Sequence, residues 1–124
     1  MLPQAKRLDN RAVNLAKAQE QPNVSQQIEA LLEAPTSGAE APTLARMEET
    51  LTEGYAEALA LEAERLRLER RLGEVARKGS PDPGAELTSL GQRLTTADGE
   101  LTRLRALLSS LHGLARAQRG RAGY

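Results

Sequence analysis

Apolar residues follow a strict repeat in the last third of the chain, from Leu87 to Gln118. Each lies alternately three and four residues beyond the one before it. The series is Leu87, Leu90, Leu94, Ala97, Leu101, Leu104, Leu108, Leu111 and Ala115, and Gln118 closes it. A period of 3.5 residues keeps one narrow stripe of an α-helix facing a partner helix. This stretch is therefore predicted to form one helix of a coiled coil.

A second stretch, from Leu44 to about Lys78, shows the same alternation. Its stripe consists of Leu44, Met47, Leu51, Gly54, Ala58, Leu61, Arg65, Leu68, Leu72 and Val75. Thr43 can accept a backbone hydrogen bond at the start of this helix, and Gly79 can end it. The turn sequence Gly-Ser-Pro-Asp-Pro-Gly follows at residues 79–84, where Asp82 is placed to cap the next helix. Two long helices in direct succession are predicted.

Two long helices joined by so short a turn are expected to lie antiparallel, as a helical hairpin. One register pairs the two stripes residue by residue, for example Leu61 with Leu101. Where the pairs are unequal, a small residue faces a large one, as Gly54 faces Leu108, so each layer keeps a similar volume. The sequence therefore predicts an antiparallel coiled-coil hairpin over residues 44–120, followed by a basic tail at 121–124.

Charges beside the stripes support this register less clearly. It creates two pairs of like-signed neighbours, Glu64 with Glu100 and Arg71 with Arg93. A parallel homodimer of the last helix would instead bring Arg93 near Asp98 of the second chain. Exposed ion pairs contribute about 0–1 kcal/mol, whereas a buried Leu side chain contributes roughly 1.5–3 kcal/mol. The apolar register of the hairpin is preferred, and the parallel homodimer stays open.

The first 34 residues predict two short amphipathic helices. Pro3 can begin the first, which extends to about Glu20, and Pro22 separates it from the second. The stripe of the first helix is Ala5, Leu8, Ala12 and Leu15, and its basic residues are Lys6, Arg7, Arg11 and Lys17. Asn23 and Gln26 match a capping box at the start of the second. Residues 35–43, rich in Pro, Thr, Ser, Gly and Ala, are predicted to be a flexible linker.

Composition favours an all-α fold. The apolar residues are mainly Leu and Ala, and the 124-residue chain contains no Phe, no Trp and two Tyr. Such a composition is typical of long helices and coiled coils, because sheets draw on β-branched and aromatic residues. The absence of a long apolar run argues against a membrane span and a signal peptide. A soluble, cytoplasmic protein is expected.

Catalytic and metal chemistry find no support in the sequence. The single histidine, His112, lacks a second ligand at metal-binding spacing. The chain has no cysteine for thiol chemistry or disulfides. The many glutamates recur at helical spacing, as in a solvated face, and a rod of helices offers no evident cleft for a catalytic pair. No cofactor, no metal and no enzymatic activity are expected.

A second apolar stripe beside the hairpin seam suggests a contact with another helix. Tyr55, Leu59 and Leu66 lie to one side of the seam, and a third helix is expected to cover them. Together with Leu107 and Leu114 of the last helix, they form the predicted set of partner-binding residues. Protein partners would pack there in coiled-coil fashion, or the chain would form a homo-oligomer.

A run of cations on the first long helix offers a different type of contact. Its possible anion-binding residues are Arg65, Arg67, Arg70, Arg71, Arg77 and Lys78. Interleaved glutamates and the lack of aromatic residues for base stacking disfavour nucleic acid. The net charge of the whole chain is zero, so no overall positive field attracts phosphate.

Three functions follow from these patterns. The first is a non-enzymatic coiled-coil interaction subunit, a structural scaffold or adaptor in a larger complex. The second is a small helical regulator or chaperone whose N-terminal helices cover a client protein. The third is a weak nucleic-acid binder that uses residues 65–78. The first is preferred, because a two-helix hairpin buries only one stripe per helix and needs further helices for stability.

Overall fold

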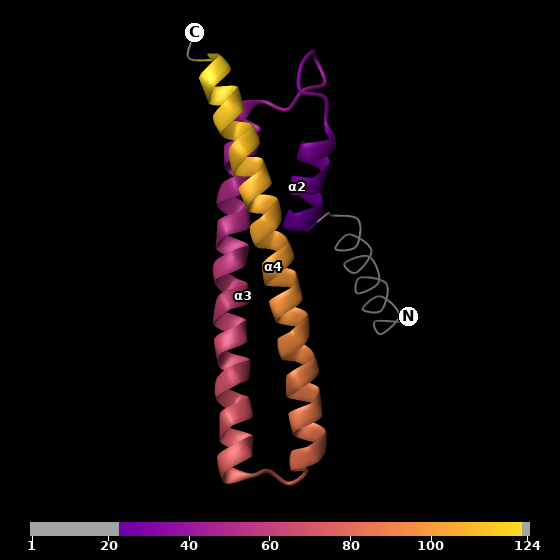
Figure 1. Ribbon diagram of the computed structural model, residues 1–124, viewed down its shortest axis with the longest axis vertical. Coiled ribbons are helices and arrows are strands. Elements are labelled where there is room, and N and C mark those ends of the chain that lie inside the picture. Colours follow the sequence, from indigo (N-terminus) through magenta and orange to yellow (C-terminus); the bar gives the residue numbers. More distant parts are fainter. Residues whose placement is uncertain (1–22, 123–124) are drawn as a thin grey trace, which may run out of the picture.

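The computed structural model describes residues 23–122; residues 1–22 and 123–124 lie outside the described part. Three α-helices make up that part: α2 (Val24–Glu33), α3 (Leu44–Lys78) and α4 (Pro83–Ala122) (Figure 1). No strand occurs between residues 23 and 122, so the predicted all-α class is confirmed there. The first predicted helix, from Pro3 to about Glu20, lies outside the described residues.

Local capping interactions fix where α2 and α3 begin. The backbone N–H of Gln26 donates to Asn23 Oδ1 at 2.8 Å, and the Asn23 N–H donates to Gln26 Oε1 at 3.1 Å. Both halves of the predicted capping box are therefore present. The backbone N–H of Arg46 donates to Thr43 Oγ1 at 3.1 Å at the start of α3. Gly79 ends α3 with a φ of 78°, a left-handed value that favours glycine.

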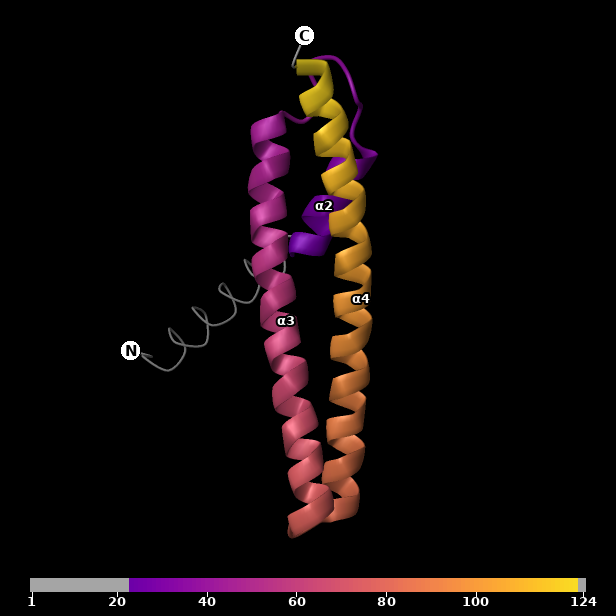
Figure 2. The same ribbon diagram turned by 60° about the vertical axis from the view of Figure 1, so that its left-hand side comes forward.

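The two long helices α3 and α4 run alongside each other in opposite directions (Figures 1 and 2). Residues 79–82 join them, and the Ala85 N–H donates to Asp82 Oδ1 at 3.4 Å at the start of α4. The Cβ of a residue placed at Gly54 would lie 2.4 Å from Leu108 Cδ2, so these two residues face each other. Residues 121 and 122, expected to belong to a basic tail, continue α4.

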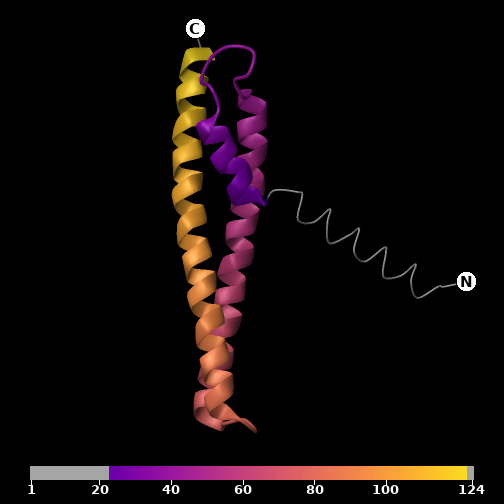
Figure 3. The ribbon, with the colours of Figure 1, turned by 90° about the vertical axis from the view of Figure 1, so that its right-hand side faces the viewer.

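The short helix α2 packs against both long helices at the end away from the turn (Figures 1 and 3). It runs in the same direction as α4, and residues 34–43 then lead back to the start of α3. We call this region the three-helix end: α2 with residues 44–61 and 101–118. The remainder of the long pair, residues 65–78 and 83–97, is the turn end.

Buried apolar side chains form two separate clusters. The cluster of the three-helix end contains Ile28, Met47, Leu51, Ala58, Leu101, Leu104, Leu108, Leu111 and Ala115. The cluster of the turn end contains Leu68, Val75, Leu90 and Ala97, with Leu72, Leu87 and Leu94 half-buried against it. The core is thus larger where α2 covers the long pair.

Arg65 occupies the stripe position of α3 between the two clusters. Its Nη1 lies 3.3 Å from Asp98 Oδ1 of α4, and its Nε lies 3.3 Å from Glu69 Oε1 of α3. One cation therefore lies between two carboxylates that would otherwise repel each other across the pair. This polar layer interrupts the apolar seam.

None of the three described helices combines the length and the apolar character needed to cross a bilayer.

Candidate protein-interaction surface

The seam between α3 and α4 has two flanks, and a seven-residue period keeps each flank on one side. We call one the α2 flank; α3 contributes to it Thr50, Glu57, Glu64 and Arg71. The other is the open flank, to which α3 contributes Glu48, Tyr55, Glu62 and Glu69. Ion pairs join the helices on both flanks. Arg93 with Glu64 and Arg71 with Glu86 lie on the α2 flank; Arg105 with Glu62 and Arg119 with Glu48 lie on the open flank.

On the α2 flank, α2 closes the core of the three-helix end. Ile28 is fully buried beside Gly54 and Leu108. Thr50 is also fully buried, and its hydroxyl donates to the Arg46 carbonyl oxygen at 3.0 Å, so the buried hydroxyl is satisfied.

Two of the five predicted partner-binding residues lie within this region. Leu107 and Leu114 are half-buried and pack against the cluster that contains Ile28. An ion pair between Arg103 Nη2 and Glu29 Oε1, 2.6 Å apart, adds a further link between α2 and α4. Leu107 and Leu114 are therefore engaged in packing within the chain.

The other three predicted residues remain exposed on the open flank. The exposed fractions are 47% for Tyr55, 66% for Leu59 and 47% for Leu66. We call these three residues the apolar strip. The expectation that a third helix covers the strip is wrong for the described helices, because α2 packs on the opposite flank.

The charges beside the seam explain why α2 packs where it does. Along most of α2 the seam is bordered by uncharged residues, Thr50, Leu107 and Leu114. The carboxylates Glu57 and Glu100 lie beside only its first residues. Along the same length, the open flank carries the Glu62–Arg105 and Glu48–Arg119 ion pairs. A helix laid over those pairs would have to desolvate four charges, which costs more than their mutual attraction returns in most settings.

A groove of about 550 Å³ lies next to the apolar strip. Ala58 and Leu108 of the core contribute to it, together with Tyr55 and Leu59 of the strip. Polar side chains complete the lining: Glu62, Arg105, Ser109 and His112. An apolar surface edged by polar groups is suited to an apolar side chain presented by another protein.

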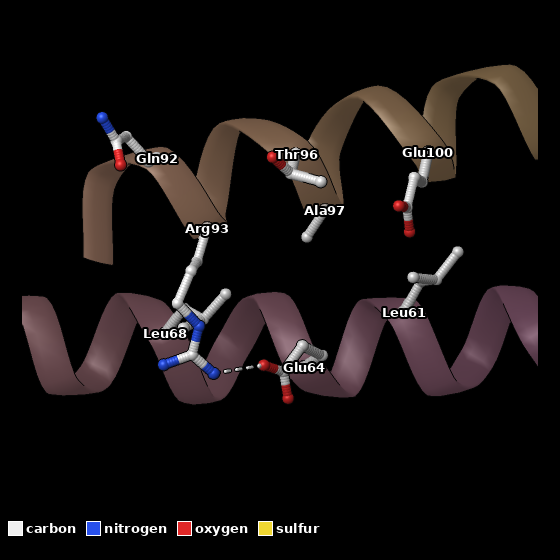
Figure 4. Close-up of a pocket in the computed structure, with 8 residues that line it drawn as sticks. All are labelled: Leu61, Glu64, Leu68, Gln92, Arg93, Thr96, Ala97 and Glu100. Atoms are coloured by element: carbon white, nitrogen blue, oxygen red, sulfur yellow. Dashed lines mark hydrogen bonds and ion pairs between the residues drawn. The ribbon is translucent and has the colours of Figure 1, made fainter. Parts of the chain in front are cut away.

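A second groove, of about 320 Å³, lies on the α2 flank at the junction with the turn end (Figure 4). Leu61, Leu68 and Ala97 supply its apolar lining. Figure 4 shows Arg93 reaching across from α4 to Glu64 of α3, and Arg93 Nη2 lies 3.2 Å from Glu64 Oε1.

Attractive ion pairs therefore form on the α2 flank where the sequence suggested like-signed neighbours. Glu64 pairs with Arg93, and Arg71 Nη2 lies 2.5 Å from Glu86 Oε1. Long side chains on this flank reach along the helix axis. Each therefore pairs with a residue seven positions, or one heptad, away from the residue that faces it in the register. The charges thus support the antiparallel arrangement.

Neighbouring groups also shift pKa values on this flank, among them those of Glu64 and Arg71. A hydrogen bond from Arg67, helped by the charges of Arg67 and Arg93, lowers the pKa of Glu64 below its ordinary value of 4.5. A hydrogen bond to Glu86 raises the pKa of Arg71. Both shifts favour the charged, paired forms.

The predicted anion-binding cluster is divided by ion pairs. Arg65, Arg67 and Arg71 each contact a carboxylate, as in the 2.8 Å pair of Arg67 with Glu64. Arg70, Arg77 and Lys78 have no ion pair within residues 23–122, and they lie at the turn end of α3. Only half of the cluster is therefore free to meet phosphate.

Metal-binding geometry does not occur in the described part of the chain. His112 lies at the edge of the open-flank groove. Over residues 23–122, no three His, Asp or Glu side chains come together in a set that could hold a metal ion.

Searches against protein-family models, curated proteins and solved structures find no match for this chain.

Proposed function

We propose that the protein is a non-enzymatic interaction subunit whose long pair, α3 and α4, is an antiparallel coiled-coil hairpin. Its partner is a protein that packs on the open flank. The observation that carries this proposal is the apolar strip, three large exposed apolar side chains, two of which, Tyr55 and Leu59, line the groove of the open flank. Contiguous exposed apolar surface of this kind marks interaction sites.

The coiled-coil assignment is supported by both the seam and the flanks. Residues spaced alternately three and four apart meet along the pair, and a small residue, Gly54, faces the large Leu108. Ion pairs on both flanks follow the pattern by which coiled coils select orientation. A rigid rod is a suitable scaffold, because a partner that meets it loses little conformational entropy on the rod's side.

The chemistry of the groove indicates the kind of partner. Its apolar lining suits one or two apolar anchors from an amphipathic helix, in the helix-in-groove mode. Glu62 and Arg105 border the groove and already pair with each other, so they do not demand a charged partner. A partner helix with a narrow apolar stripe and a polar remainder fits these conditions.

Replacing the two leucines of the apolar strip by serine tests the proposal. In the double variant Leu59→Ser and Leu66→Ser, the protein should lose its partner in affinity purification followed by mass spectrometry. Because both side chains are exposed, helical circular dichroism should remain close to wild type. The matched control is Thr52→Ser with Glu53→Gln, also exposed on α3, which should retain the partner. Full recovery of the same partner by the strip variant would contradict the proposal.

Light scattering coupled to size exclusion determines whether the partner is a second copy. If the strip mediates self-association, the wild type should have a mass above that of the 13.4 kDa chain, and the strip variant should be monomeric. If the wild type is monomeric, the partner is a different protein.

Nucleic-acid binding is the weaker candidate. Ion pairs reduce the positive potential of Arg65, Arg67 and Arg71 that a phosphate would meet. Binding through the remaining cations should be no tighter than about 10⁻⁴ to 10⁻⁶ M near physiological salt, the range of nonspecific contacts.

A further inference from the structure

The α2 flank is covered along only part of its length. α2 packs over the three-helix end. The groove of Figure 4 adjoins the first residues of α2, because it shares Leu61 and Glu100 with a groove that Asn23 and Val24 also line. Leu61, Leu68 and Ala97 line this groove, and its polar edge includes Thr96 and Glu100. Residues 23–122 supply no helix that covers it.

The chain enters α2 at the head of this groove. Asn23 and Val24 line an adjoining groove of about 520 Å³ together with Glu57, Leu61 and Glu100. Leu61 and Glu100 belong to both grooves. The residues that precede Asn23 therefore join the described structure directly beside the uncovered part of the α2 flank, and the apolar strip lies on the other flank.

The length of the preceding segment matches the length of the uncovered flank. A helix over residues 3–20, as the sequence predicts, would be about 27 Å long at 1.5 Å per residue. From Leu61 to Lys78, α3 also has 18 residues and spans about 27 Å by the same measure. A segment running in the direction of α2 would thus extend from the head of the groove to the turn.

The chemistry of the segment complements that of the groove. Its stripe of Ala5, Leu8, Ala12 and Leu15 is narrow and small, as a shallow apolar groove requires. Glu57 and Glu100 both line the head of the groove, and neither forms an ion pair within residues 23–122. Lys17 is the basic residue of the segment nearest to them along the chain. A cation between two unpaired carboxylates is favourable.

We propose that residues 3–20 dock in this groove of their own chain, as a further helix parallel to α2. Their small apolar stripe packs on Leu61, Leu68 and Ala97, and Lys17 meets Glu57 and Glu100. The α2 flank is then covered from end to end by the chain itself, and the apolar strip remains the free face. This docking does not depend on the proposed partner.

A spin label in the groove tests the position of the segment. The chain has no cysteine, so Thr96→Cys in the full chain gives one labelling site at the groove edge. Amide signals of residues 3–20 should lose intensity with this label. They should keep it with the label at Ser109→Cys, in the groove of the open flank. Two results would overturn the proposal: loss of amide intensity with the label at Ser109→Cys, or unchanged intensity with both labels.

Mixing two samples separates docking within one chain from exchange between chains. Isotope-labelled chain without a spin label is combined with spin-labelled chain that carries no isotope. Unchanged signals of residues 3–20 in the mixture support docking within the chain. Loss of intensity in the mixture would assign the groove to a second copy and overturn the proposal.

Two variants of the segment test the forces that hold it. Leu15→Asp should restore the amide intensity of residues 3–20 in the chain labelled at Thr96→Cys, while helical circular dichroism of the rest persists. Lys17→Glu should raise the rate of tryptic cleavage after Arg11 by up to about fivefold, the effect of one exposed ion pair. Adding Glu100→Lys to Lys17→Glu should bring that rate back toward wild type. An unchanged rate in both Lys17 variants would refute the assigned contact.

Discussion

The three-helix end and the turn end are built from the same two helices, yet they differ in how completely they bury their seam. At the three-helix end, Leu101, Leu104 and Leu111 are at most 1% exposed. At the turn end, Leu72, Leu87 and Leu94 are only half-buried, although they occupy equivalent seam positions. The difference is α2, which covers one flank of the first region and leaves the second as a bare pair.

This contrast shows what a third helix contributes to a pair of long antiparallel helices. The half-buried seam residues of the turn end, such as Leu72 and Leu94, keep part of their surface toward water. Their burial is therefore worth less than the roughly 1.5–3 kcal/mol of full burial. Exposed ion pairs such as Arg71–Glu86 add little at the turn end, about 0–1 kcal/mol each. The turn end should therefore open more readily than the three-helix end.

A carboxylate placed in the seam should show the largest difference between the two regions. Leu94 and Leu101 lie seven residues apart on α4 and occupy the same seam position. Leu101→Asp places an unpaired charge among fully buried side chains and should unfold the chain, since the penalty is comparable with the net stability of a small domain. Leu94→Asp should lower the melting temperature but leave a folded protein.

Circular dichroism melts of these two variants provide the measurement. Exposed Glu53→Asp is the control and should melt like the wild type. If Leu94→Asp and Leu101→Asp lower the melting temperature equally, α2 adds nothing to the burial of the seam.

Shortening the one fully buried residue of α2 should weaken only the three-helix end. Ile28→Ala should cost about 2–5 kcal/mol, because it leaves a cavity beside Gly54 and Leu108. Amide hydrogen exchange should speed up in α2 and residues 101–118, and stay unchanged at residues 83–97. Leu32→Ala, at a half-buried position, should have a smaller effect. Faster exchange spread evenly along α4 would mean that the two ends do not behave as separate units.

Two glycines within α3 allow a matched test of packing. A Cβ at Gly54 would come within 2.4 Å of Leu108 Cδ2 and 3.4 Å of Ile28 Cδ1, whereas one at Gly73 meets nothing within 4 Å. Alanine raises helix propensity by about 1 kcal/mol at either site. Overpacking costs about 1–3 kcal/mol, so Gly54→Ala should lower the melting temperature and Gly73→Ala should raise it. A rise in both would show that Leu108 moves aside freely.

Lowering the pH should have the smallest effect of these changes, and it should act at the Glu64–Arg93 ion pair. The pKa of Glu64 is lowered in the folded protein, so its contribution to stability is complete above the unfolded value and is lost as the pH falls through the folded value. Below about pH 4.5, the amides near Glu64 and Arg93 should therefore lose protection, measured as the exchange rate relative to that of an unstructured amide at the same pH. In Glu64→Gln this acid response should be reduced. An identical pH dependence in both proteins would contradict the role of the ion pair.

Local signals for helix ends could be predicted from the sequence, whereas the choice of flank could not. Asn23, Thr43 and Gly79 act on their own backbone neighbourhood, and each performs the predicted role. The packing of α2 depends on which flank of α3 and α4 carries uncharged residues at the three-helix end. That property emerges only when Thr50 and Leu107, far apart in sequence, are brought to the same side.

The surplus apolar residues beside the seam could be identified from the sequence, but their division between two flanks could not. Tyr55, Leu59 and Leu107 were recognisable as surplus apolar residues beside the seam. Their separation onto two flanks, one covered and one exposed, required the structure. The ion pairs beside the seam were missed for a related reason, since Arg93 reaches Glu64 along the axis and not its layer partner.

The connection between α2 and α3 makes α2 a tethered ligand of the long pair. Residues 34–43 hold it close, at an effective concentration of roughly millimolar order for a short linker. Dilution of the protein therefore leaves α2 docked. A separate helix that competes for the same part of the flank would have to match that local concentration, so α2 has the advantage there over a helix of another molecule.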